Sequence, residues 1–158
     1  NPSKGFKQFL RTLTGGRITI GALALGTAQG AYERALKYSC EREAFGKQIN
    51  KFQAVSFKLA DMATSIQASK HLVYHAAHLK DQGQEIIKEA AMAKLFSSEM
   101  CMRVTTDAIQ IFGGYGYIKE YDVERFFRDS KILEIGEGTS EVQRIVISRE
   151  ILNNLSSV

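Results

Sequence analysis

The chain has 158 residues, of which 44% are hydrophobic and 24% charged, as expected for a globular domain with a substantial core. No apolar run approaches the ~20 residues that a membrane-spanning helix needs, and the first residues lack a signal-peptide pattern. The net charge of +4 is compatible with an anionic partner. The basic residues are interspersed with acidic ones, however, so we expect solvated helix faces and no nucleic-acid-binding surface.

Helices account for most of the sequence pattern. The only proline is Pro2, and apolar residues recur at helical spacing over long stretches. We expect helices at about residues 16–40, 51–81, 85–112 and 140–155, with a short helical piece at about 123–130. Because long helices with short connections pack against antiparallel neighbours, the sequence predicts an all-α, antiparallel four-helix bundle with a short extra helical segment. Residues 1–158 then form a single domain.

The same spacing predicts which side chains face the core. On the first helix these are Ile20, Leu23, Thr27, Gly30, Ala31, Ala35 and Tyr38. On the second they are Phe52, Val55, Leu59, Met62 and Ile66, and on the third Ile86, Ala90, Ala93, Phe96, Met100, Val104, Ala108 and Ile111. Steps of three and four residues along the second helix are typical of near-antiparallel bundle packing.

The histidine spacing bears on a possible metal site, and the two cysteines bear on a possible disulfide. His71, His75 and His78 share one face of the second predicted helix, and a histidine pair four residues apart can bind zinc. No Cys, Asp or Glu in that helix completes a recognised ligand set, so we expect a polar helix face and no metal site. Cys40 and Cys101 are isolated and lack CxxC spacing, which is typical of small buried side chains in a reducing compartment.

Glu137 stands on a flexible Glu-Gly step just before the last predicted helix. Ser140 is placed to be the N-cap of that helix, and Gln143 follows three residues later, which is the capping-box spacing. A carboxylate between a mobile loop and a rigid helix can reach a substrate proton. An acidic residue there also favours the positive end of the helix dipole, so local sequence leaves both interpretations open.

Two further segments also have a structural and a functional interpretation. Gly113–Gly116 can end a helix, because glycine adopts the left-handed conformation at little cost, or it can let the backbone approach a ligand closely. Arg42, at the end of the first predicted helix, can complement the negative helix end or offer its guanidinium to a phosphate.

Together these segments occur in a distinctive order. Gly16-Arg17 opens the first helix, RxxFG follows at Arg42–Gly46, QIFGGYGY lies at residues 110–117, and RDSKILEIGEGTSEVQR covers residues 128–144. In this order and spacing, residues 5 to 152 resemble the C-terminal helical domain of the acyl-CoA dehydrogenases, flavoproteins that oxidise the α,β bond of acyl-CoA thioesters. Segments 14–18, 57–62 and 88–95 are most similar to the short-chain branch.

The resemblance implies roles for individual residues. Glu137 corresponds to the catalytic base that removes the α-proton while a hydride moves from the β-carbon to the flavin. Residues implied to contact FAD of a neighbouring subunit are Arg42, Phe45, Gln53, Gln110, Ile111, Phe112, Gly113 and Gly114, and those implied to contact the subunit's own FAD are Thr139 and Glu141. Residues implied to contact acyl-CoA are Thr14, Gly15, Gly16, Arg17 and Gly138.

Two positions refine this assignment. In some branches the base stands beside the arginine of the first bundle helix, but here that neighbour is Gly16, so Glu137 is uncontested. The residue before the base is commonly tyrosine in the family, and here it is Gly136. Loss of the ring implies a wider acyl pocket, which suits a branched short chain as an alternative to a straight one.

The resemblance also implies the setting of the reaction. The chain is then the last domain of a longer homotetrameric or homodimeric enzyme, without its N-terminal helical and middle β-domains, and inactive alone. Electrons pass to an electron-transfer flavoprotein, in the cytoplasm of a bacterium or the mitochondrial matrix of a eukaryote. An acyl-CoA oxidase, which uses the same base, is an alternative, as is a DNA-binding or structural relative, in which the base is expected to be lost. Nitroalkane oxidases have aspartate as base, so Glu137 argues against them.

Overall fold

The computed structural model describes the backbone of residues 2–155 and the side chains of residue 5 and residues 12–153. Its α-helices are α1 (Pro2–Glu41), α2 (Gln53–Asp81), α3 (Ile87–Phe112), α4 (Val123–Ile135) and α5 (Ser140–Leu155). An antiparallel hairpin, β1 (Glu43–Ala44) and β2 (Lys47–Gln48), and the 3-10 turn η1 (Ile49–Lys51) join α1 to α2. Two further 3-10 turns, η2 (Gly113–Tyr117) and η3 (Lys119–Tyr121), join α3 to α4.

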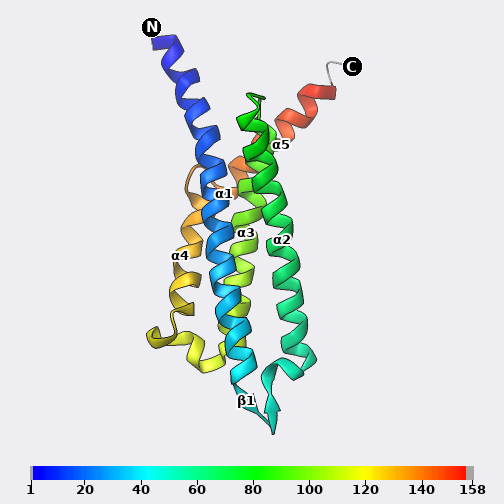
Figure 1. Cartoon of the computed structure of the whole chain (residues 1–158). Helices are drawn as coiled ribbons and strands as arrows, with labels where there is room; N and C mark the ends of the chain where they lie inside the picture. Colours follow the sequence, from blue (N-terminus) through cyan, green and yellow to red (C-terminus); the bar gives the residue numbers. More distant parts are fainter. Residues whose placement is uncertain (1, 156–158) are drawn as a thin grey trace.

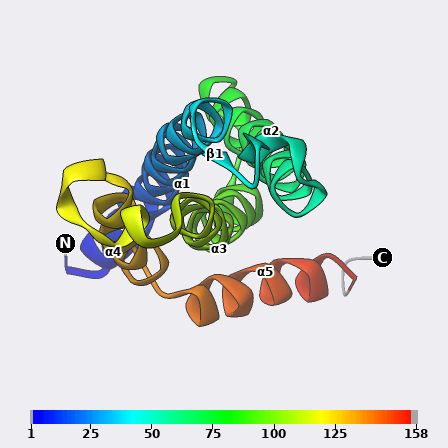
Figure 2. The same ribbon diagram turned by 90° about the horizontal axis from the view of Figure 1, so that it is seen from below.

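The first four helices run alternately along one axis, with the hairpin at the lower end in Figure 1. The predicted all-α class and antiparallel bundle are confirmed. The piece predicted at 123–130 continues to Ile135 and packs beside α1 and α3, whereas α5 lies along one side of α3 and then leaves the bundle (Figure 2). The first helix was predicted to begin near residue 16, but α1 begins at Pro2, because Gly15 and Gly16 lie inside the helix and do not start it. The hairpin around Gly46 falls between the first two predicted helices and was not predicted.

Small side chains bring α1 close to its neighbours. Ala24, Ala28, Ala31 and Ala35 are fully buried and form the inward stripe of α1. The prediction that Leu23 faces the core is wrong, since 55% of this residue is exposed. The reason is that the inward face is set by alanines at steps of three and four residues, which let helices approach more closely than leucine would allow.

The α2–α3 seam is as predicted. Leu59, Met62 and Ile66 of α2 are buried in the same core as Met100 and Val104 of α3. Two polar links accompany this apolar seam. The hydroxyls of Ser69 and Ser97 lie 2.7 Å apart within it, and Lys58 Nζ donates to Asp107 Oδ1 at 2.6 Å nearer its edge.

The histidines and one of the two cysteines lie on the surface of the bundle. His71, His75 and His78 are exposed on α2, and the described residues contain no group of three or more side chains able to hold a metal ion. Cys101 is buried as expected, but Cys40 is exposed, because it faces away from the alanine stripe. No helix in the described part of the chain is long and apolar enough to cross a membrane.

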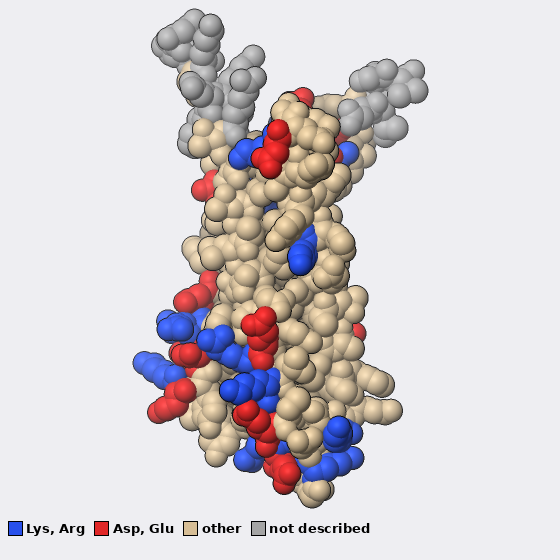
Figure 3. Space-filling view, in the orientation of Figure 1, with Lys and Arg blue, Asp and Glu red and all other residues tan. Residues whose placement is uncertain are grey.

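Charged side chains are unevenly distributed on the face shown in Figure 3. Lys and Arg lie among Asp and Glu toward the hairpin end, and charged side chains are sparse over the middle of the bundle. The two helices at the front of this view, α1 and α2, expose large apolar side chains: Leu23 by 55%, Phe57 by 60% and Tyr74 by 64%.

Candidate active site and cofactor-binding cavity

The loop between α4 and α5 places Glu137 in an uncommon backbone conformation. Helix α4 ends at Ile135, and the Gly136 N–H donates to Ile132 O at 2.8 Å. Glu137 has φ 56°, in the left-handed region that a residue with a side chain seldom adopts, and Gly138 follows with φ 95°. Such a conformation costs roughly 1–3 kcal/mol and persists only where surrounding contacts fix it.

The cap of α5 lies one residue earlier than the sequence predicts. Thr139 Oγ1 accepts from the Val142 N–H at 3.4 Å, and Thr139 O accepts from the Gln143 N–H at 3.0 Å. Thr139 is therefore the N-cap. The expected capping box of Ser140 and Gln143 is wrong, since the buried Ser140 Oγ has no hydrogen-bond partner in the described part of the chain and the Gln143 amide points back into the loop.

The carboxylate of Glu137 lies directly against α1 at Gly16. A Cβ built on Gly16 would be 2.8 Å from Glu137 Oε2 and 3.0 Å from its Cδ. No side chain can therefore stand at position 16 while the carboxylate keeps this place. Residues that are 121 positions apart in sequence thus form one site, and Gly16 contributes to it through the absence of a side chain.

Arg17 adds a positive charge to the same site. The residue is only 8% exposed, and its buried Nε has no hydrogen-bond partner among the described residues. Burial lowers the pKa of the Arg17 guanidinium, and the negative charge of Glu137 partly opposes this shift. Thr14 and Gly15 lie within one turn of Arg17 on α1. The segment 14–17 and the Glu137–Gly138 step therefore belong to one region.

Two buried side chains, neither of them predicted to contact this loop, bind it from the inside. Lys94 of α3 is fully buried, and its Nζ donates to Glu134 O at 3.0 Å and Gly138 O at 2.8 Å. The Gln143 amide donates to Glu137 O at 3.2 Å and Gly138 O at 2.9 Å. A lysine within an otherwise small and apolar helix face is the signal that could have identified Lys94.

A second group of predicted site residues meets at the hairpin end of the bundle. A cavity of about 440 Å³ lies between the end of α1 and the η2 turn, and its predicted members are Arg42, Ile111, Phe112, Gly113 and Gly114. Gly113 has φ 61° and ends α3, so its structural role is confirmed.

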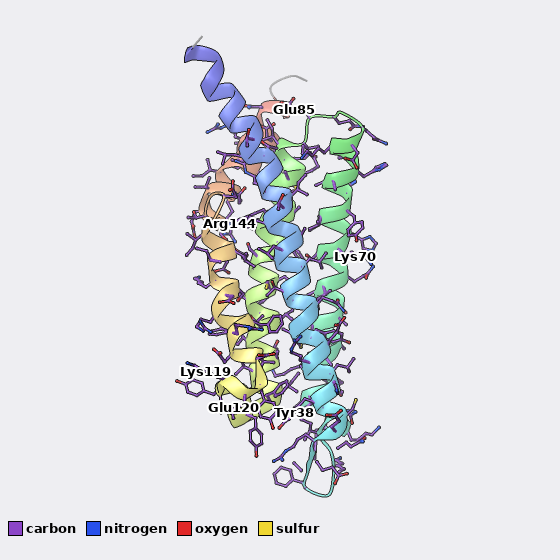
Figure 4. The ribbon with its side chains drawn as sticks, turned by 60° about the vertical axis from the view of Figure 1, so that its left-hand side comes forward. Tyr38, Lys70, Glu85, Lys119, Glu120 and Arg144 are labelled. Carbon is purple, nitrogen blue, oxygen red and sulfur yellow. The ribbon has the colours of Figure 1, made fainter. Side chains whose placement is uncertain are left out.

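Aromatic rings line this cavity, and those of Tyr38 and Tyr115 were not predicted to belong to a ligand site. Tyr38 stacks on Phe112 with ring centroids 4.1 Å apart, and the Arg42 guanidinium lies 5.6 Å from the centroid of the Tyr115 ring. Burial raises the pKa of Tyr38, and the nearby charge of Arg42 opposes that shift. In Figure 4, Tyr38 lies at this end of the molecule with Lys119 and Glu120, far from Arg144 of α5.

The other predicted cofactor contacts lie outside that cavity. Phe45 is 96% exposed at the hairpin tip and Gln53 is exposed at the start of α2. Gln110 faces a separate groove between α3, α4 and the η turns. Thr139 and Glu141 line a third cavity, of about 380 Å³, beside α3 and α4. Hydrogen bonds from its own backbone N–H and from the Thr139 hydroxyl lower the pKa of the exposed Glu141 carboxyl.

The two predicted groups are too far apart to act on one ligand within a single chain. Gly16 and Glu41 are 25 residues apart on the continuous helix α1, which corresponds to ~38 Å at 1.5 Å per residue. The Glu137 carboxylate lies beside Gly16, and Arg42 directly follows Glu41 in the chain. This separation exceeds the reach of one dinucleotide.

Comparison with known proteins establishes the family. Residues 3–152 match the acyl-CoA dehydrogenase C-terminal domain. The chain belongs to the acyl-CoA dehydrogenase family. The resemblance inferred from the sequence, including its similarity to the short-chain branch, is confirmed.

Individual relatives in this family are similar over nearly the whole chain. The chain is 59% identical over 152 residues to a probable acyl-CoA dehydrogenase, YngJ, of Bacillus subtilis, covering 96% of this chain and 40% of YngJ. It is 51% identical over 150 residues to CarC, a subunit of the caffeyl-CoA reductase-Etf complex of Acetobacterium woodii, covering 95% of this chain and 40% of CarC. Butyryl-CoA dehydrogenase of Megasphaera elsdenii has the same fold, with a TM-score of 0.93 at 52% identity over 94% of this chain and 39% of that one. The chain therefore spans about 40% of the length of these relatives.

The family is FAD-dependent, and the residues of the hairpin-end cavity fit part of such a cofactor. Arg42 presents a guanidinium suited to phosphate, and Phe112 and Tyr115 present rings beside it. At Gly113 and Gly114 no atom lies within 4 Å of the position of a Cβ, so the backbone there is open to a ligand. A guanidinium beside aromatic rings and open backbone suits a ligand that carries both a phosphate and a flat ring.

Proposed function

We propose that this chain is the C-terminal domain of a longer FAD-dependent acyl-CoA dehydrogenase, with Glu137 as the base that removes the α-proton of an acyl-CoA thioester. The observation that carries the proposal is the contact between the Glu137 carboxylate and Gly16, beside the buried Arg17. A base needs a fixed carboxylate within reach of the substrate proton. The left-handed loop and the bare α1 backbone supply that position.

The reaction divides between this chain and its cofactor. FAD, when bound, accepts the hydride that leaves the β-carbon, and the α,β single bond becomes the double bond of a trans-2-enoyl-CoA. Glu137 takes the α-proton on its carboxylate. The α-proton of a thioester is a far weaker acid than a glutamic acid in water, so the site must polarise the thioester carbonyl and exclude water. Glu137 is exposed in this chain by itself, so that exclusion falls to the substrate and the rest of the enzyme.

The cofactor site is proposed to be shared between subunits. Arg42, Phe45 and Gln53, with segment 110–114, contact the FAD of a neighbouring subunit, and Thr139 and Glu141 contact the subunit's own FAD. The ~38 Å between the two groups supports this division. A homotetramer or homodimer follows, which the exposed apolar side chains of α1 and α2 also support.

We further propose that acyl-CoA contacts Thr14, Gly15, Gly16, Arg17 and Gly138, and that an electron-transfer flavoprotein reoxidises the enzyme. The relationship to CarC, a subunit of a reductase-Etf complex, supports that partner. Rapid reoxidation of the substrate-reduced enzyme in air would instead assign an acyl-CoA oxidase.

The test uses the holoenzyme that contains this domain and its Glu137→Gln variant. Anaerobic mixing with butyryl-CoA should bleach the flavin in the wild type. In the variant, FAD and acyl-CoA binding should persist while the rate of bleaching falls by about 100- to 10,000-fold, because an amide cannot accept the proton. Glu33→Gln on α1, an exposed acid bonded to Gln29, is the matched control. Near-normal bleaching by Glu137→Gln would overturn the assignment.

A further inference from the structure

Lys94 is the largest fully buried side chain among the residues whose side chains the structure describes, and the proton-transfer chemistry gives it no role. An isolated ammonium is costly to bury, so a lysine in the core needs compensating partners. Its partners are two backbone carbonyls, Glu134 O at 3.0 Å and Gly138 O at 2.8 Å. Burial lowers the pKa of Lys94, and the negative charges of Glu134, Glu141 and Glu99 oppose that shift.

The two carbonyls lie on either side of the base. Glu134 O belongs to the last turn of α4, where helix carbonyls have no intrahelical donor. Gly138 O comes directly after Glu137 and also accepts from Gln143 Nε2 at 2.9 Å. Lys94 therefore ties the end of α4 to the far side of the loop, and the whole segment between them is held at both ends.

The same contacts orient the α4–α5 loop so that its backbone carbonyls face the core and the Glu137 side chain faces α1. The carbonyls of Glu137 and Gly138 point inward to Lys94 and Gln143, and the Glu137 carboxylate lies on the other side, against Gly16. Because Glu137 is held at φ 56°, which a side-chain-bearing residue avoids, removing these donors should let the peptide relax. The carboxylate would then leave Gly16.

We propose that Lys94 is a positioning residue: its ammonium, with the Gln143 amide as second donor, holds the Glu137 peptide in the left-handed conformation that directs the carboxylate to Gly16. This inference rests on the proposed function of Glu137 as base. An ammonium suits the task because it has three donors, no acceptor and a full positive charge that faces two backbone carbonyls. Arginine, with its planar fork, does not offer a compact point charge of this kind.

The test replaces Lys94 by methionine in the holoenzyme. Methionine fills similar space but leaves both carbonyls without this donor. Flavin reduction by saturating butyryl-CoA should slow by about 100-fold, the loss that a displacement of about 1 Å causes at a reacting centre. FAD content and the affinity for enoyl-CoA product should stay at wild-type values. Lys88→Met, on the same helix and paired with Glu89 at the surface, is the control and should reduce at the wild-type rate.

A double-mutant cycle separates positioning from a general loss of structure. If Lys94 acts through Glu137, then Lys94→Met adds no further loss in the Glu137→Gln background, whereas independent effects multiply. Wild-type reduction by Lys94→Met, or the same fold-loss in both backgrounds, overturns the inference. If Lys94→Met does not fold, Gln143→Leu, which removes the second donor, enters the same cycle with the same expected outcomes.

The outcome also separates this inference from the proposed function. Rapid bleaching by the single variant Glu137→Gln rejects Glu137 as base, whatever Lys94→Met does. A large loss in Glu137→Gln together with wild-type behaviour in Lys94→Met rejects only the positioning role.

Discussion

Glu137 Oε2 lies so close to Gly16 that a side chain there would collide with it, since a Cβ on Gly16 would be 2.8 Å from that oxygen. The atom in the way is the end of a flexible side chain, so a methyl group at position 16 would move the carboxylate without disturbing the helix backbone. A substitution at position 16 should therefore change the rate of the reaction without lowering the free energy of unfolding.

We therefore predict that Gly16→Ala lowers the rate of flavin reduction by about 10- to 100-fold, because the base is pushed from its place. The free energy of unfolding should not fall, and can rise by up to about 1 kcal/mol, because alanine is the better helix former. Stopped-flow reduction and thermal unfolding measure the two effects. Gly26→Ala on the same helix, where no atom lies within 4 Å of the new methyl group, should keep full activity.

Arg42→Ala should weaken retention of FAD. Hydrogen bonds to a charged group contribute about 1.5–3 kcal/mol, which corresponds to roughly 10- to 150-fold in affinity. Loss of FAD during gel filtration of the holoenzyme measures the effect, with Lys37→Ala, an exposed cation near the same helix end, as control. The 158-residue chain alone should bind FAD weakly, since it offers separate parts of two sites. Tight stoichiometric binding by this chain, or full retention by Arg42→Ala, would contradict the shared site.

Gly136→Tyr should narrow the acyl pocket. The substitution is sterically possible, because Gly136 has φ −61° and its Cβ would meet only Ile132 O, at 3.4 Å. Each methyl or methylene group of the substrate should change kcat/KM by only about 1–3 kcal/mol in free energy, so the preference among substrates should change gradually. The measurement compares kcat/KM for butyryl-, isobutyryl-, 2-methylbutyryl- and octanoyl-CoA. An unchanged ratio of branched to straight substrates would show that Gly136 does not shape the pocket.

The two cysteines should differ sharply in reactivity. Burial raises the pKa of the Cys101 thiol to about 12, so at mildly alkaline pH it carries almost no thiolate, which is the reactive form. Cys40 is exposed, with Asn50 Nδ2 3.2 Å from its Sγ. Peptide mapping after brief alkylation of the folded protein should find Cys40 modified and Cys101 intact, and denaturation should expose both. Equal labelling in the folded state would refute this prediction.

Much of the fold could be predicted from the sequence because its signals are local and periodic. The 3.6-residue repeat, the single proline and the glycine steps place four helices to within a few residues at every boundary except the start of α1, which lies at Pro2 and not near residue 16. The seam of Leu59, Met62 and Ile66 follows from spacing alone. Leu23 was misassigned because hydrophobicity ranks leucine above alanine, whereas the close approach of α1 to its neighbours selects the alanines.

The sequence by itself determined the family and the residue types of the site, because the glutamate-glycine step, RxxFG and QIFGGYGY each occupy a short contiguous stretch. Only the tertiary structure decided how they meet. It brings Glu137 against Gly16, leaves Arg42 ~38 Å away, and reveals Lys94 beneath the loop. These relationships join segments from 44 to 121 residues apart. Spacing along one helix or loop carries no information about them, because they arise from the packing of α1, α3 and α5 around the α4–α5 loop.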